Sequence, residues 1–96
     1  MLKVVAEHQV KEDCLEKFKE LAKVIVGKTV ALDQGCISYS VCQDVDNPLH
    51  CSMIEEWESK EMLDKHMQAP HFREIVPQIG ECCEGAMSIT LYNKLC

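Results

Sequence analysis

The sequence has little positive charge. Its 96 residues include 10 Lys and Arg against 16 Asp and Glu, which gives a formal net charge of −6. Proteins that bind DNA or RNA need clustered Lys and Arg to contact phosphates, so we expect no nucleic-acid partner. Arg73 is the only arginine, and a phosphorylated ligand is therefore only weakly supported.

Long apolar runs are also missing. No stretch approaches the ~18 consecutive apolar residues of a membrane span. Residues 1–7 lack the apolar segment and cleavage pattern of a signal peptide. We therefore expect no membrane partner and a cytoplasmic location. A chain of 96 residues forms one domain, 1–96. So small a core leaves modest stability unless the chain oligomerises.

Standard metal-ligand and disulfide patterns are absent too. The seven cysteines are odd in number and include no CxxC pair, which favours idle thiols in a reducing cytosol. His66 and His71 lie five residues apart with Pro70 between them, and no carboxylate–histidine motif brackets them. We therefore expect that no metal ion is required.

What the sequence does contain is a regular series of strands and helices. Period-two alternation predicts the strands, and apolar residues at helical spacing predict the helices. Asp13 and Glu16 resemble a capping box, Ser59 is a good N-cap, and Pro77 is expected to shorten the last helix. The predicted strands are 2–10, 36–43, 50–58 and 86–93, and the predicted helices are about 13–32, 59–68 and 71–81.

This β-α-β-β-α-β order predicts an α+β, ferredoxin-like fold, in which helices cover one face of a four-stranded antiparallel sheet. The other face would be polar if water covered it. Instead it carries Val5, Ile54 and Tyr92 among its residues. We therefore expect a homodimer formed through the sheet face opposite the helices.

The candidate site centres on residues 55–72. Trp57 ends a predicted strand, and His66 lies on the apolar stripe of the next helix, so both can point into one space. His71 and Phe72 follow at its rim. His8 lies in the middle of the apolar face of the first strand. Each of these side chains could equally be an ordinary buried core residue.

Several short motifs together resemble the antibiotic biosynthesis monooxygenase (ABM) superfamily of dimeric α+β-barrel proteins, and most of all the bacterial quinol monooxygenases. The motifs are Val4-Val5-Ala6-Glu7, Gly35-Cys36 with Tyr39, Glu55-Glu56-Trp57-Glu58-Ser59, and His66 with Pro70-His71-Phe72. A second likeness, through Gln43-Asp44 and Pro70-His71, is to the autoinducer-2 phosphate-processing isomerase of the same superfamily.

The resemblance implies a pocket between helices and sheet in which a quinol or polycyclic phenol is oxidised by dioxygen without metal or flavin. Such a reaction needs a base near neutral pKa, hydrogen-bond donors and a dry wall. His66 is the first choice as base, with His8 and His71 as the other catalytic candidates. The expected substrate-binding residues are Trp57, Tyr39, Glu55, Phe72 and Met53. The haem-degrading members of the superfamily are a poor match, because Val76 falls near the position of their axial histidine.

Two alternatives stay open. One is an isomerase of a small keto compound, phosphorylated or not, and the other is a non-catalytic small-molecule binding protein on the same scaffold. The fold does not decide among these functions. Oxygen consumption with a quinol separates the monooxygenase from both alternatives.

Overall fold

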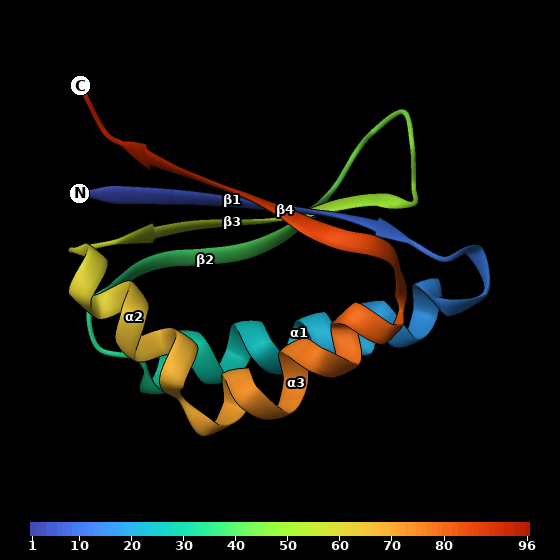
Figure 1. Ribbon diagram of the computed structural model, residues 1–96, viewed down its shortest axis with the longest axis horizontal. Coiled ribbons are helices and arrows are strands. Elements are labelled where there is room, and N and C mark those ends of the chain that lie inside the picture. The colour runs from blue at the N-terminus through green and yellow to red at the C-terminus, as the bar shows by residue number, and fades with distance from the viewer.

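The computed structural model describes residues 1–96 and confirms a four-stranded antiparallel sheet with helices on one face (Figure 1). The strands lie in the order β2-β3-β1-β4. The elements are β1 Leu2–Val10, the 3₁₀ turn η1 Glu12–Cys14, α1 Leu15–Leu32, β2 Cys36–Gln43, β3 His50–Trp57, α2 Lys60–Gln68, α3 Pro70–Glu81 and β4 Cys83–Asn93. No helix is long and apolar enough to cross a membrane.

Side-chain alternation in the central strands sends one set of residues toward the helices. Every second residue of β1, from Leu2 to Val10, is buried. Leu2 pairs with Trp57 and Val4 pairs with Glu55, so these two β3 side chains share the helix-facing side. The predicted strand pattern is confirmed here, and β3 delivers the candidate site residues to the core.

The ends of the helices follow local rules, with two exceptions. Ser59 caps α2, since its hydroxyl accepts a hydrogen bond from the Met62 amide at 3.3 Å. The capping box at Asp13 was a wrong prediction, because α1 begins only after η1 and has no side-chain cap. Pro77 does not shorten α3 as predicted. It lies on the exposed side, while Ile75 and Ile79 anchor the opposite side in the core.

Gly35 holds the end of α1 close to the start of α2. Its φ of +80° lies in the left-handed region that favours glycine, and an added Cβ would lie 2.3 Å from Met62 Cγ. Its carbonyl also accepts a hydrogen bond from the Glu58 amide at 2.9 Å. This close approach brings the C-terminal end of α1 beside α2, which matters for the site described below.

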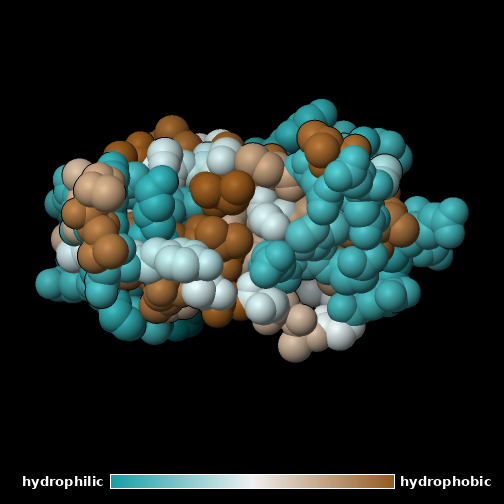
Figure 2. Space-filling view, turned by 90° about the horizontal axis from the view of Figure 1, so that it is seen from above, coloured by the Kyte–Doolittle hydropathy of each residue, from teal (hydrophilic) through white to brown (hydrophobic).

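The face of the sheet opposite the helices is mixed. Ile54 and Tyr92 are 40% and 52% exposed there, and Ile54 pairs with the half-buried Val5. Figure 2 looks onto this side and shows apolar residues interspersed with polar ones. The buried carboxylate of Glu56 lies between two lysines. Its Oε2 is 3.8 Å from Lys3 Nζ, and its Oε1 is 3.4 Å from Lys94 Nζ. The homodimer through this face stays a prediction.

Replacing Ile54 with Lys tests that interface. The parent chain is expected to sediment with about twice the mass of one chain, and Ile54→Lys is expected to weaken the dimer, because an unpaired charge buried in an interface costs several kcal/mol. Val45→Lys is the matched control, since Val45 is 95% exposed in the β2–β3 turn. A monomeric parent, or equal weakening by both variants, would contradict the prediction.

Candidate active site

His66 lies at the centre of a group of aromatic rings supplied by four elements. It comes from α2 and is only 2% exposed. Its ring centroid lies 4.7 Å from that of Trp57 in β3, 5.0 Å from Phe72 in α3 and 5.4 Å from Tyr39 in β2. The structure therefore brings together four of the residues that the sequence predicted for one site.

The carboxylate of Asp33 joins His66 to His71. Asp33 Oδ2 lies 2.5 Å from His66 Nδ1, and Asp33 Oδ1 lies 2.9 Å from His71 Nε2. Asp33 is the C-cap residue of α1, and its side chain is only 8% exposed. Asp33 directly follows the predicted helix 13–32, and it was not among the predicted site residues. One signal was present: a carboxylate at the negative end of a helix dipole is unfavourable unless cations or donors compensate it.

These contacts fix which ring nitrogen of His66 carries the proton. Burial lowers the pKa of His66, while the hydrogen bond and charge of Asp33 act in the opposite direction, so the ring is neutral at neutral pH. An ionised carboxylate only accepts hydrogen bonds, and Nδ1 of His66 is therefore the donor to Asp33. Nε2 is left with its lone pair, and it is buried without any hydrogen-bond partner.

A cavity of about 190 Å³ lies against this ring. Its wall combines apolar side chains of the sheet and helices with a few polar groups, Tyr39, Glu55, Lys60 and His66. Met53 and Phe72 belong to the apolar part, as predicted. On the β4 side the wall consists of Met87, Ile89 and Leu91. The last two are 50% and 42% exposed, so the cavity is thinly covered there.

Burial favours the uncharged forms of both Glu55 and Tyr39. Burial raises the pKa of Glu55 to about 7, although the hydrogen bond from Trp57 Nε1 at 2.9 Å acts to lower it. Burial, followed by the charge of Glu55, raises the pKa of Tyr39, whose hydroxyl donates to Met53 Sδ at 3.4 Å. The Trp57 N–H is thus bound to Glu55, and Trp57 itself does not line the cavity.

His8 and His71 lie apart from the cavity. His8 packs on Phe18 with ring centroids 5.9 Å apart, at the far end of β1 from Trp57. Burial lowers its pKa, and its Nε2 has no hydrogen-bond partner. His71 is 7% exposed and contacts Asp33 on the side away from the cavity lining. Neither ring is placed to contact a molecule in the cavity beside His66.

Metal-ligating side chains do meet in the fold, although sequence spacing did not indicate it. Asp33, His66 and His71 offer ligand atoms that all lie within 4.8 Å of one another. The spacing of the two histidines gives no sign of the third donor, because the carboxylate of Asp33 comes from the end of a different helix. The expectation that no metal is required stays a prediction.

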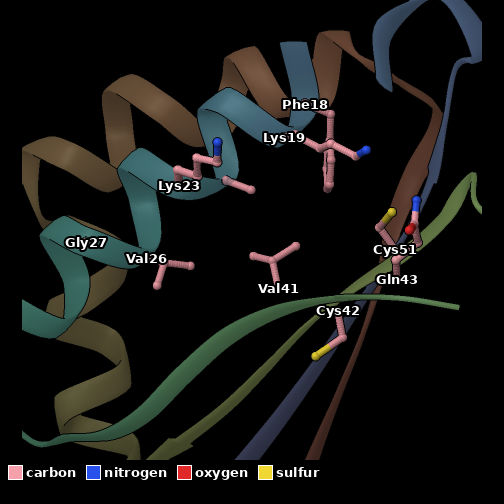
Figure 3. Close-up of a pocket in the computed structure, with 10 residues that line it drawn as sticks. Phe18, Lys19, Lys23, Val26, Gly27, Val41, Cys42, Gln43 and Cys51 are labelled. Carbon is pink, nitrogen blue, oxygen red and sulfur yellow. The ribbon is translucent and has the colours of Figure 1, made fainter. Parts of the chain in front are cut away.

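A second cavity of about 490 Å³ lies between α1 and β2 (Figure 3). Phe18, Val26 and Val41 are turned into this space, and Lys19 and Lys23 flank it. It contains no histidine, and histidine is the residue type that the sequence predicted as the base. The smaller cavity beside His66 is therefore the candidate active site.

Replacing Glu55 with Gln tests its neutral form. A folded pKa of about 7 means that the protonated carboxyl stabilises the fold fully below about pH 4.5, and that this stabilisation is lost as pH rises toward 7. Glu55→Gln keeps an acceptor for Trp57 and should raise the free energy of unfolding at pH 8 by about 2–3 kcal/mol. Denaturant titrations at pH 5 and pH 8 measure this, with the exposed Glu58→Gln as control. An equal change in the free energy of unfolding at pH 5 and at pH 8 would contradict the raised pKa of Glu55.

Comparison with known proteins agrees with the fold described above. The family model described as antibiotic biosynthesis monooxygenase matches residues 1–78. The chain is 38% identical to a conserved protein from Methanosarcina mazei Go1, with a TM-score of 0.94 and coverage of 97% of this chain and 91% of that one. It is 29% identical to an antibiotic biosynthesis monooxygenase of known structure, with a TM-score of 0.92 and 99% of each chain covered.

Among curated proteins, it is 29% identical over 90 residues to the sll1783 protein of Synechocystis sp. strain PCC 6803. That match includes 94% of this chain but only 60% of the length of the relative. The family match spans most of the chain, the fold agrees over nearly all of it, and the pocket lies between helices and sheet. The chain belongs to the antibiotic biosynthesis monooxygenase family.

Proposed function

We propose that this protein is a cofactor-free monooxygenase that oxidises a quinol or other electron-rich phenol with dioxygen. One observation carries the proposal: His66 lines an apolar cavity, its Nε2 is buried without a hydrogen-bond partner, and Asp33 holds its Nδ1–H. This is the arrangement of a general base with an orienting carboxylate. Family membership supports monooxygenase chemistry in general, and the quinol is our inference.

The reaction begins with removal of the phenolic proton. His66 Nε2 accepts that proton, and the imidazolium that forms is stabilised by the carboxylate of Asp33. The phenolate then transfers an electron to dioxygen, and the resulting superoxide and phenoxyl radicals combine into a carbon–oxygen bond. Loss of water from the hydroperoxide leaves a carbonyl. A quinol plus dioxygen thus gives a hydroxyquinone plus water, and the quinol supplies all four electrons.

The remaining residues make this base effective. Trp57, Phe72 and Tyr39 pack around the imidazole and exclude water, which strengthens electrostatic interactions within the site. Glu55 is uncharged in part at neutral pH, so it adds little repulsion against a forming phenolate. Its second carboxyl oxygen, when protonated, is a donor available to the substrate.

The volume of the cavity limits the size of the substrate. About 190 Å³ is smaller than the usual range of roughly 300–1,000 Å³ for ligand sites. A substrate of one or two fused rings is favoured over a larger polycyclic phenol. The thin cover at Ile89 and Leu91 is the side on which a larger substrate would protrude.

Removing His66 tests the proposed base. Oxygen uptake with a two-ring quinol of the menadiol type is expected in the parent, and His66→Ala is expected to lower turnover by roughly 10²–10⁴-fold. His50→Ala is the matched control, because His50 is bound to Asp44 and Glu7 at the β2–β3 turn and does not line the cavity. Equal rates in the parent and His66→Ala would rule out His66 as the base. A keto substrate converted without oxygen would favour the isomerase instead.

Chelation tests the cofactor-free part of the proposal. Prolonged treatment with a strong chelator, followed by assay in metal-free buffer, is expected to leave oxygen uptake unchanged or higher. Metal content is measured on the same samples by mass spectrometry. Loss of activity that one specific ion restores would overturn the proposal, because His66 would then be acting as a metal ligand.

A further inference from the structure

The side chains that orient the proposed base also form a set of metal-binding donors. We propose that Asp33, His66 and His71 bind one divalent transition-metal ion of the zinc class, and that this ion switches the base off. The inhibitory part of this inference rests on the proposed function, whereas the binding site does not.

The donor chemistry fits such an ion. Two imidazole nitrogens and one carboxylate suit zinc and its neighbours in the first transition row, and do not suit calcium or magnesium. The three groups come from the end of α1, from α2 and from α3, and their side chains are 8%, 1% and 7% exposed. Such buried, converging donors differ from the scattered carboxylates of an acidic surface.

An ion has its own route to this site. A recess of about 390 Å³ on the surface is lined by Asp33, His71, Lys28 and Glu74, with Leu32, Ala69 and Pro70. It shares no residue with the cavity that His66 lines, so an ion and a substrate would approach from different sides. The recess has room for water ligands, and Glu74 lies on its wall. The net charge of −6 favours cations over anions.

Only a small movement is needed to admit the ion. Bonds of about 2.0–2.2 Å to nitrogen and oxygen place ligands on one ion about 3–3.5 Å apart. Asp33 Oδ2 lies 3.0 Å from His71 Nε2 and 2.5 Å from His66 Nδ1, and the three donor atoms lie within 4.8 Å of one another. Asp33 and His66 must therefore separate by up to about 1 Å, and the two histidine nitrogens must come closer together by about as much. Asp33 ends α1 in extended backbone conformation, where its side chain is not confined within a helix.

Ion binding at Nδ1 changes what His66 can do at the cavity. Without the ion, Nδ1 carries the proton and Nε2 accepts one from the substrate. A metal–nitrogen bond replaces the Nδ1–H bond, and an Nε2–H bond forms, so the ring stays neutral. Nε2 is then a donor and has no lone pair for a phenolic proton. A bound ion therefore inhibits by changing the tautomer, without entering the cavity.

Cobalt(II) and zinc(II) are the probes for binding. Titration of the metal-free parent with Co²⁺ should show one ion per chain, with d–d absorption of nitrogen and oxygen ligation, and Zn²⁺ should displace it. His71→Gln keeps a donor to Asp33 but removes the imidazole, and it should weaken binding by about 10-fold or more. Asp33→Asn is a second variant with the same expected result. His50→Ala, the other carboxylate-bound histidine, should bind like the parent.

Thiols are the main competing ligands, because all seven cysteines are unpaired. An intense thiolate-to-cobalt charge-transfer band, or binding that His71→Gln and Asp33→Asn leave unchanged, would overturn the site. If binding is confirmed, Zn²⁺ should inhibit oxygen uptake in the parent at about 10-fold or more lower concentration than in His71→Gln. If the ion binds but Zn²⁺ inhibits the parent and His71→Gln at the same concentration, the proposed inhibition of the base is wrong. A parent that binds Co²⁺ as expected but consumes no oxygen contradicts only the proposed function.

Discussion

The carboxylate of Asp33 is the constraint on which the site depends. It is the point where the end of α1, the last turn of α2 and the start of α3 meet, through hydrogen bonds to His66 and His71. A buried carboxylate is costly unless donors satisfy it, and here two imidazoles do so. The same bonds orient His66 and leave its Nε2 without a hydrogen-bond partner. One interaction thus joins the three helices and sets the tautomer of the proposed base.

Most of the fold could be predicted because local patterns decide it. Alternation in residues 2–10 gives β1 to the residue, and Ser59 and Pro70 mark the starts of α2 and α3. Predictions from local sequence patterns were wrong at two positions where tertiary packing determines the structure. Pro77 stays inside a helix whose other side is anchored in the core, and Asp13 precedes a 3₁₀ turn in place of capping α1.

The candidate site was predicted only in part, and the geometry of the strands and helices explains which residues were predicted correctly. Trp57, His66, Phe72 and Tyr39 gather as expected, because the end of β3 and the inner stripe of α2 follow each other directly. His8 shares the correct face of β1 but pairs with Cys51, whereas Trp57 pairs with Leu2. At about 3.3 Å per residue, the six residue steps from Leu2 to His8 separate His8 from Trp57 by about 20 Å along the strand. Asp33 was missed because no local pattern indicates which helices its side chain will join.

In the proposed reaction, charge balance explains why two buried acids can lie beside a cavity in which a phenolate would form. Asp33 is compensated by two imidazoles, and it gains a full cationic partner at the moment His66 accepts a proton. Glu55 has no such partner, and burial raises its pKa to about 7. A phenolate forming in the cavity would raise that pKa further, since two like charges in a low-dielectric site repel. The two carboxylates therefore take different roles. In the proposed reaction, Asp33 supports the base through its hydrogen bond to His66, and Glu55 becomes protonated when negative charge develops on the substrate.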